Sequence, residues 1–221
     1  MKKKIYSIGV LFLFSGITLY TGCKKDDTTP PVVTLKGNAS ENSVLNAAYS
    51  DPGATASDDE DGDISSSIVV SGSVNKDLKG SYTLTYTATD AAGNVGTATR
   101  TVAVKNDAEP WAGSYTITDT NPAISGSYNG TISTSSTVNN KIIINNLGKY
   151  GVDVQAVIAG TKVTIASQTI TSSAISGTPD TGPIYTTADG SLSGSTTMAI
   201  PYRWDYQTGS YDAGTATLVK Q

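Results

Sequence analysis

Alternation of apolar and polar residues is the main pattern of the chain beyond its N-terminal segment. The clearest stretch is residues 80–90, where every second residue from Tyr82 to Ala88 is apolar and the residues between them are threonines. A period of two is typical of a β-strand with one buried face. A turn at residues 91–94 and a second alternating stretch at residues 95–105 predict a partner strand.

The same pattern divides the chain into two β domains. Residues 32–35 and 68–70 are also strand-like, and several short strands separated by turns indicate a β-sandwich. A polar stretch at residues 106–110 then interrupts the alternation. We therefore expect a first domain at residues 31–106 and a second at residues 108–221.

The second domain also consists of strand-like stretches joined by short polar turns, with a passage rich in glycine, proline and serine at residues 172–183. The stretches are residues 113–119, 126–135, 141–147, 150–160, 161–170, 190–206 and 209–220. About eight antiparallel strands favour a small barrel, lipocalin-like in outline, or a sandwich. No stretch shows helical periodicity, so the expected fold class is all-β.

The N-terminus has the pattern of an export signal. Lysines at positions 2–4 precede an apolar run at residues 8–19, which is shorter than the roughly 20 residues that a membrane-spanning helix needs. We expect residues 1–22 to be a signal peptide and residues 23–30 a polar linker. An uncleaved anchor helix is the alternative.

Cys23 is the only cysteine, and an unpaired cysteine in an exported protein needs an explanation. The preceding residues 19–22, LYTG, resemble the lipobox of bacterial lipoproteins, with Tyr20 where leucine is usual. The resemblance implies that Cys23 is lipidated and attaches the mature chain to the membrane. Residues 25–27, KDD, resemble the signal that directs Bacteroidetes lipoproteins to the cell surface; an ordinary polar tether is the alternative. The expected location is the outer membrane, exposed at the cell surface.

Composition excludes several function classes. The chain has no histidine and one cysteine, which rules out disulfide frameworks, soft metal sites and histidine-dependent triads. Loss of the three lysines of the signal peptide takes the formal net charge from −4 to −7. A mildly acidic chain gives no electrostatic reason to bind nucleic acid, and we expect none as a partner.

Catalysis by paired carboxylates is the remaining enzymatic option. Asp153, Asp189, Asp205 and Asp212 are available in the second domain, but none lies in a recognisable catalytic motif. Aspartates in turn-rich β domains mostly form turns. We therefore expect that the chain is not an enzyme.

Four motifs in the first domain carry a family resemblance. They are YSDPG at 49–53, DGD at 61–63, GSYTLTY at 80–86 and DAAGN at 90–94. Together they resemble the bacterial immunoglobulin-like domain of the Cry22Aa type, which is frequent in Bacteroidetes surface proteins. The resemblance covers residues 31–105 and implies an immunoglobulin-like sandwich that serves as a spacer or an adhesive unit, without catalytic residues. The second domain opens with WAGSYTI and closes with GTATLVKQ, which resemble C-terminal domains of Bacteroidetes lipoproteins without known activity.

The acidic segment at residues 57–63, SDDEDGD, raises the question of a metal site. Gly62 at the sixth position of an EF-hand loop leaves Ser57 and Ile68 at the two end positions, so the segment is not an EF-hand. A looser calcium site remains open, with oxygen ligands from two loops at one end of the sandwich. Its candidate ligands are Asp59, Asp61, Asp63 and Asp90. The alternative is a solvated acidic turn.

Aromatic residues supply the candidate ligand surface. Tyr202, Trp204 and Tyr206 share one face of a predicted strand, and Arg203 and Asp205 share the other. Three outward rings would form a flat platform for a sugar, whereas three inward rings would be core. Two charges facing a core would be costly, so we expect Trp204 to be buried.

Ligand contacts would then come from strand ends and loops around Trp111, Tyr185 or Tyr211. Two function classes follow from these patterns. In the first, the chain is a lipid-anchored surface module that binds a glycan or another surface protein. In the second, it is a structural spacer or part of an envelope assembly without a small ligand. No cofactor other than calcium is expected.

Overall fold

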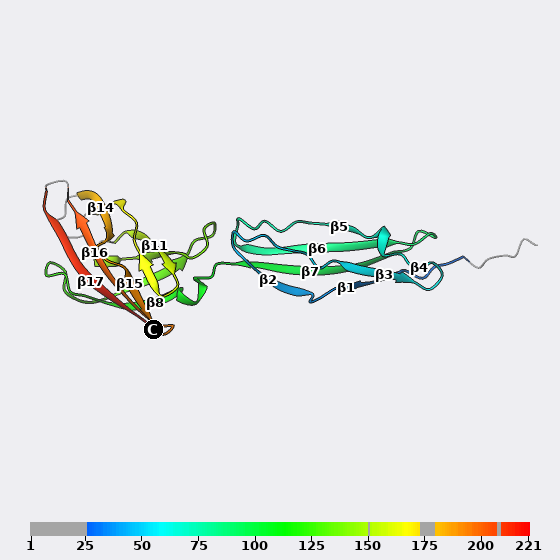
Figure 1. Ribbon diagram of the computed structural model, residues 1–221, viewed down its shortest axis with the longest axis horizontal. Helices are drawn as coiled ribbons and strands as arrows, with labels where there is room; N and C mark the ends of the chain where they lie inside the picture. Colours follow the sequence, from blue (N-terminus) through cyan, green and yellow to red (C-terminus); the bar gives the residue numbers. More distant parts are fainter. Residues whose placement is uncertain (1–25, 150, 173–179, 207–208) are drawn as a thin grey trace, which may run out of the picture.

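A computed structural model describes residues 26–149, 151–172, 180–206 and 209–221. The predicted signal peptide and Cys23 lie outside the described residues. Figure 1 shows two β domains that follow one another along the long axis of the molecule. The only helical elements among the described residues are three 3₁₀ turns, η1 (Ser65–Ser67), η2 (Glu109–Trp111) and η3 (Leu147–Lys149). No described helix has the length and apolar character that crossing a membrane requires. The all-β prediction is confirmed.

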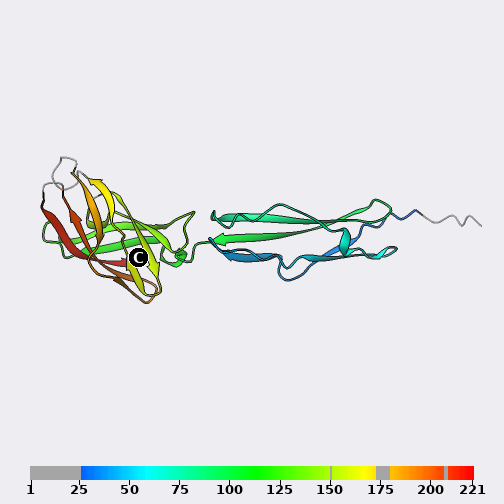
Figure 2. The same ribbon diagram turned by 45° about the horizontal axis from the view of Figure 1, so that its top comes forward.

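The N-terminal domain is a sandwich of two sheets. One contains β1 (Val32–Leu35), β3 (Ala54–Asp58) and β4 (Gly62–Asp63), and the other β2 (Ser40–Val44), β7 (Val95–Lys105), β6 (Gly80–Thr89) and β5 (Val69–Ser71) in that order. The strands β6 and β7 pair along their whole length as predicted, from Gly80 opposite Val104 to Thr89 opposite Val95. Figure 2 shows the sandwich and the barrel from a second direction.

The alternation of β6 places its apolar side chains in the core of the sandwich. Leu84, Tyr86 and Ala88 are buried, together with Val102 and Val104 of β7. Tyr82 is only half-buried, and its hydroxyl donates to the carbonyl of Leu78 outside the core. The side chains of the threonines between these residues point away from the core, on the other face of the strand.

Arg100 of β7 is a buried cation at the centre of this domain. Its side chain forms an ion pair with Asp51, and its Nε and Nη2 donate to the carbonyls of Asn38 at 3.0 Å and Gly53 at 3.2 Å. The Tyr86 hydroxyl donates to Asp51 at 2.6 Å. The YSDPG motif therefore has a structural role, because it brings a carboxylate and a carbonyl to the same buried guanidinium.

The C-terminal domain is an antiparallel β-barrel. Its strands are β8 (Gly113–Asp119), β9 (Gly126–Thr134), β10 (Lys141–Asn145), β11 (Asp153–Ala159), β12 (Lys162–Thr164), β13 (Gln168–Ser172), β14 (Asp180–Thr186), β15 (Gly190–Ser193), β16 (Thr197–Asp205) and β17 (Tyr211–Lys220). Eight of them, β8 to β12 and β15 to β17, form a ring that closes where β17 pairs with β8. The predicted barrel is confirmed.

The hairpin of β13 and β14 widens one side of the ring. The first half of β16 pairs with β15 and its second half with β14, so Ala199 faces Ser191 and Trp204 faces Ile184. Where β13 bends away from β11, the side-chain amide of Gln168 replaces backbone pairing: it donates to the carbonyl of Gln155 at 2.6 Å and accepts from its N–H at 2.9 Å.

Three sequence-based assignments are wrong in this domain. The stretch 161–170, expected as one strand, is divided into β12 and β13. The stretch 190–206, expected as one strand, is divided into β15 and β16 by a turn in which Gly194 has a φ of +60°. Such a backbone angle favours glycine. The passage at 172–183, which is not among the predicted strand-like stretches, contributes the first part of β14. Pairing with β13 and β16 outweighs the local propensity of this segment.

The barrel interior is filled by side chains rather than by solvent. One contiguous core joins inward-facing residues of all strands of the ring, among them Ile117, Ile142, Ile144, Val154, Val163, Met198, Ile200, Tyr202, Trp204 and Leu218. An eight-stranded barrel is just wide enough for its own side chains to fill it. The described residues thus form a solid barrel.

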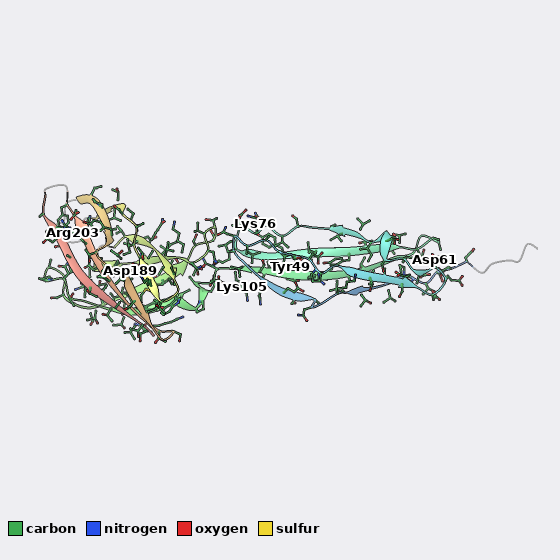
Figure 3. The ribbon with its side chains drawn as sticks, viewed as in Figure 1. Tyr49, Asp61, Lys76, Lys105, Asp189 and Arg203 are labelled. Atoms are coloured by element: carbon green, nitrogen blue, oxygen red, sulfur yellow. The ribbon has the colours of Figure 1, made fainter. Side chains whose placement is uncertain are left out.

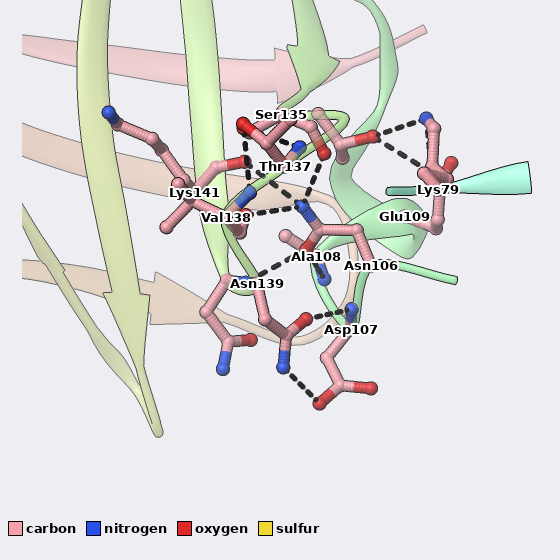
Figure 4. Close-up of polar contacts among 12 residues, drawn as sticks. Lys79, Asn106, Asp107, Ala108, Glu109, Ser135, Thr137, Val138, Asn139 and Lys141 are labelled. Atoms are coloured by element: carbon pink, nitrogen blue, oxygen red, sulfur yellow. Dashed lines mark hydrogen bonds and ion pairs between the residues drawn. The ribbon is translucent and has the colours of Figure 1, made fainter. Parts of the chain in front are cut away.

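Asn106 fixes the junction between the two domains, as Figure 4 shows. The side chain is buried; its Nδ2 donates to the carbonyls of Ser135 at 2.9 Å and Val138 at 3.0 Å. Its Oδ1 accepts from the backbone N–H groups of Ala108 at 3.0 Å and Asn140 at 2.9 Å. The connection between β9 and β10 is therefore held around one side chain of the interdomain linker.

The same connection also contacts the end of the sandwich. Lys79 donates its backbone N–H to the carbonyl of Ser136 at 2.7 Å, and its ammonium lies 2.7 Å from Glu109. The amide of Asn46 donates to the carbonyl of Thr137 at 3.0 Å and accepts from the N–H of Asn139 at 2.8 Å. These contacts join the two domains in addition to the linker itself.

Candidate binding surface

The predicted aromatic face of β16 belongs to the barrel core. Trp204 is 1% exposed and Tyr202 is buried as well, so the expectation that Trp204 is buried is confirmed. The Tyr202 hydroxyl donates to Asp119 at 2.9 Å, which satisfies its polar end inside the barrel. Tyr206, at the end of the row, packs against this core, with its ring centroid 4.9 Å from that of Trp204. Tyr202 and Trp204 are therefore not available to a ligand on the surface.

Trp111 is also part of the core. It closes the 3₁₀ turn η2 beside the domain junction and is 9% exposed. Its carbonyl accepts a hydrogen bond from the hydroxyl of buried Tyr115 at 2.7 Å. The structure thus assigns Trp111 to packing under the barrel end rather than to an open surface.

The outward face of the same strand presents a different cluster, which we name the Arg203 patch: Tyr185, Arg203, Asp205 and Tyr211. Tyr185 of β14 lies directly opposite Arg203 of β16, and Asp205 lies opposite Tyr211 of β17. Because side chains alternate along a strand, these pairs put all four residues on the outside of the barrel.

The four side chains of the Arg203 patch contact one another. The Nε of Arg203 donates to Asp205, and the guanidinium carbon lies 3.9 Å from the ring centroid of Tyr211. The Tyr185 hydroxyl donates to Asp205 at 3.0 Å. Tyr211 nevertheless stays 56% exposed. Within the described parts of the chain, the two terminal nitrogens of Arg203 donate to no other group.

Electrostatics keep this cluster ionised at neutral pH. The hydrogen bond from Arg203 lowers the pKa of Asp205, against a smaller effect of burial, and the hydrogen bond to Asp205 raises the pKa of Arg203. The hydrogen bond to Asp205, followed by burial, raises the pKa of the Tyr185 hydroxyl. The patch therefore offers a guanidinium donor, a carboxylate acceptor and an open phenol ring with no net charge.

The sequence indicated Tyr185 and Tyr211 as ligand contacts but not Arg203 and Asp205. The alternation of β16 predicted that Arg203 and Asp205 lie on the solvent-facing side of the strand, and the structure confirms this. Their position between two tyrosines depends on which strands flank β16. That information is not present in the local pattern of any one strand.

The predicted calcium ligands are not assembled as expected. Asp63 accepts hydrogen bonds from the N–H and Oγ of Ser65, and Asp90 accepts the N–H groups of Gly93 and Asn94 within its own turn. The two loops do meet, since Asp61 accepts the N–H of Ala91 at 2.7 Å. Among the residues that the structure describes, the acidic groups that lie together are instead Asp27, Asp58 and Asp59.

A separate hollow of about 430 Å³ opens on the sandwich. Tyr49 and Lys76 are among the residues that line it, and both are labelled in Figure 3. The Tyr49 hydroxyl donates to Glu41 at 2.6 Å, so its polar end is already paired within the domain. The hollow is also lined by apolar side chains of the sandwich, among them Val70, Val74 and Leu84.

Comparisons with known proteins describe the first domain most directly. Residues 33–104 match the family model for the Ig-like domain of bacterial surface proteins. No curated protein matches the chain in sequence. Among solved structures, the lipoprotein BT2262 from Bacteroides thetaiotaomicron is 21% identical with a TM-score of 0.35, over 86% of this chain and 100% of that one.

A second solved structure contains CBM51-2, in complex with GlcNAc, and INT domains from Clostridium perfringens ZmpB. It is 14% identical with a TM-score of 0.30, over 86% of this chain and 43% of that one. TM-scores at this level do not establish a common arrangement of the whole chains. The N-terminal domain, at residues 33–104, is thus an Ig-like domain similar to those of bacterial surface proteins.

Proposed function

We propose that the chain is a surface-tethered glycan-binding protein in which the Ig-like domain is a stalk and the barrel carries the binding site. The observation that carries the proposal is the position of the Arg203 patch. Figure 3 shows Arg203 at one end of the molecule and Asp61 near the other, where the N-terminal segment enters. An anchor at lipidated Cys23 would therefore hold the patch as far from the membrane as the fold allows.

The chemistry of the patch suits a hydroxylated ligand. One side of the Tyr211 ring faces Arg203, and more than half of the residue remains exposed for stacking on the apolar face of a sugar. The terminal nitrogens of Arg203 form a rigid fork of donors, and Asp205 accepts hydrogen bonds. Because the charges of Arg203 and Asp205 compensate, the patch favours a neutral glycan over a strongly anionic one.

The junction supports the role of the sandwich as a stalk. The contacts of Asn46, Lys79 and Asn106 with the β9–β10 connection would limit bending between the domains. A limited hinge keeps the patch pointing away from the anchor. The same rigidity also favours the second candidate function, a structural spacer without a small ligand, which differs in making no use of the Arg203 patch.

A catalytic role is not part of this proposal. Each of the four aspartates considered for catalysis has a structural partner: Asp153 accepts from Asn145, Asp189 from Lys162, Asp205 from Arg203 and Asp212 from Tyr206. The hydrogen bond from Lys162 lowers the pKa of Asp189, whereas a general acid needs a raised one.

A glycan array tests the proposal. The full-length chain in detergent should bind a restricted set of neutral glycans, and Tyr211→Ala and Arg203→Met should each reduce that binding at least tenfold. Val219→Ala, which shortens another exposed side chain of β17, is the matched control and should bind as the unaltered chain does. Equal binding by Tyr211→Ala and the control would place the ligand elsewhere. An absence of any glycan binding would favour the spacer.

A further inference from the structure

Three carboxylates meet where the N-terminal segment reaches the sandwich. Asp58 ends β3, Asp59 begins the turn to β4, and Asp27 precedes β1. One carboxylate oxygen of each lies within 4.8 Å of one oxygen of each of the others. Three residues that are adjacent in space thus come from two separate segments of the chain.

Asp58 is the buried member of this group. It is 8% exposed, and its Oδ1 accepts the backbone N–H groups of Glu60 and Asp61, both at 3.0 Å. Its Oδ2 is buried without a hydrogen-bond partner. Buried polar atoms in native proteins are nearly always paired, and an unpaired carboxylate oxygen is among the most unfavourable groups to bury.

None of these three carboxylates forms an ion pair with a described residue. The ion pairs of the described residues involve other carboxylates, such as Asp51 with Arg100 and Asp77 with Lys76. Three like charges at this separation repel one another, and the repulsion is relieved by a bound cation. The buried oxygen and the absence of an ion pair at these described carboxylates both favour a cation at this position.

We infer that Asp27, Asp58 and Asp59 bind a calcium ion. Calcium takes six to eight oxygen ligands at about 2.3–2.6 Å, so two oxygens bound to one ion lie no more than about 5 Å apart. The spacing of the three carboxylates meets this limit. Carboxylates that bind through one or both oxygens supply three to six ligands, and water completes the shell. Magnesium fits less well, since it demands strict octahedral geometry and retains most of its water.

The site would have a mechanical consequence. Asp27 belongs to the segment that leads from the predicted anchor, and its carbonyl already accepts from the side-chain amide of Asn94 at 3.3 Å. A calcium ion shared with Asp58 and Asp59 would fasten this segment to the end of the sandwich. Calcium would then fix the direction in which the stalk leaves the membrane, independently of what the barrel binds.

Titration calorimetry with calcium chloride tests the inference on the full-length chain in detergent after chelator treatment. We expect one ion per chain, with a dissociation constant of about 10⁻⁴–10⁻³ M, the range of extracellular modules. Asp58→Asn and Asp27→Asn should each weaken binding at least tenfold. Asp63→Asn removes a charge from the same hairpin and is the matched control. It should bind calcium like the unaltered chain, because the Asp63 carboxylate accepts hydrogen bonds from Ser65 and is not one of the proposed ligands.

Thermal unfolding gives a second readout. If the site binds calcium, the effect of Asp58→Asn on the melting temperature reverses when calcium is added, whereas a solvated acidic turn produces no such reversal. In chelator, Asp58→Asn should melt at or above the temperature of the unaltered chain, because it removes repulsion. In millimolar calcium it should melt below it, because only the unaltered chain gains from binding. The far-ultraviolet circular dichroism of each variant reports folding. If Asp58→Asn does not fold, the same measurements on Asp27→Asn test the inference. Asp27 lies outside every described strand, so its substitution should not prevent folding.

Three outcomes would overturn the inference. The first is no binding heat up to about 10 mM calcium, ten times the weak end of the expected range. The second is an equal loss of binding in Asp63→Asn and Asp58→Asn, which would move the site to the acidic residues nearer Ser65. The third is equal affinity for magnesium, which contradicts the selectivity expected of calcium.

Discussion

Arg100 and Asp51 form an ion pair inside the Ig-like domain, although 49 positions separate them in the chain. The side chain of Arg100 is 0% exposed, and it also donates to the carbonyls of Asn38 and Gly53. The pair therefore ties the YSDPG motif to β7. It explains why a charged residue occupies an inward position of a strand whose other buried residues are glycine and valine.

Replacement of Arg100 should destabilise this domain strongly. Arg100→Met leaves Asp51 without its cation and removes the donors to Asn38 and Gly53; loss of one partner of a buried pair costs about 3–5 kcal/mol. Asp51 is partly exposed, so a value near the lower end is expected. Urea unfolding followed by circular dichroism measures it. Lys105→Met, an exposed change on the same strand, is the control, and a difference below about 1 kcal/mol between the two variants would contradict the role of the pair.

Acid should weaken the same domain through Asp51. Burial acts to raise the pKa of Asp51, but hydrogen bonds from Tyr86 and Gly53 and the charge of Arg100 outweigh it, and the pKa is lowered. A carboxyl with a lowered folded-state pKa stabilises the fold above its unfolded-state pKa, and this contribution is lost as pH falls through the folded value.

The melting temperature of the Ig-like domain should therefore decrease between about pH 5 and pH 3. Asp51→Asn should melt lower than the unaltered chain at pH 7 and lose less over the acidic range. Calorimetry at a series of pH values measures both. Parallel curves for the two proteins would show that Asp51 does not contribute to the pH dependence.

Substitutions at Trp204 and Tyr211 should differ in their effect on the free energy of unfolding, because the two residues lie on opposite faces of the barrel wall. Trp204→Ala removes a buried ring and should cost about 3–5 kcal/mol, as large-to-small changes in a core do. Tyr211→Ala removes an exposed ring and should change the free energy of unfolding by no more than about 0.5 kcal/mol. Chemical unfolding of the barrel reports both values. Similar losses for the two variants would contradict the orientation of β16 and β17.

Loss of the Asn106 side chain should loosen the junction. Asn106→Ala leaves the N–H of Asn140 and the carbonyls of Ser135 and Val138 without this partner, at a cost of about 1–3 kcal/mol. Small-angle X-ray scattering should show a wider distribution of interdomain distances. Asn42→Ala, an exposed asparagine of β2, should leave the distribution unchanged. An unaltered distribution in Asn106→Ala would mean that Asn46 and Lys79 hold the domains without it.

The anchor is tested at Cys23. Cys23→Ser removes the thiol that would carry the lipid, so the chain should accumulate unprocessed or leave the membrane. Cell fractionation and the size of the product distinguish these results from a lipid-anchored protein. A variant of mature size in the membrane fraction would exclude the lipoprotein interpretation.

Local patterns predicted the parts of the fold whose burial follows a simple period. The alternation of β6 and β7 gave both strands, and that of β16 gave the inward orientation of Trp204. The limits of β15 and β14 were missed because they depend on a glycine turn and on pairing with distant strands. The Arg203 patch and the group around Asp58 were missed for a related reason: each joins residues of separate segments, and a periodic pattern carries no information about which segments become neighbours.

Closure of the barrel by β17 has a consequence for the order of folding. All strands of the sandwich precede residue 106, so this domain can be completed while the rest of the chain is still being synthesised or exported. The ring of the barrel cannot close before its final strand reaches β8, which lies near the opposite end of the domain sequence. Until then β8 and β16 are open sheet edges that can pair with other chains. Such a distant pairing is slow to form, so deletion or delayed release of β17 should cause aggregation of the barrel while the stalk folds normally.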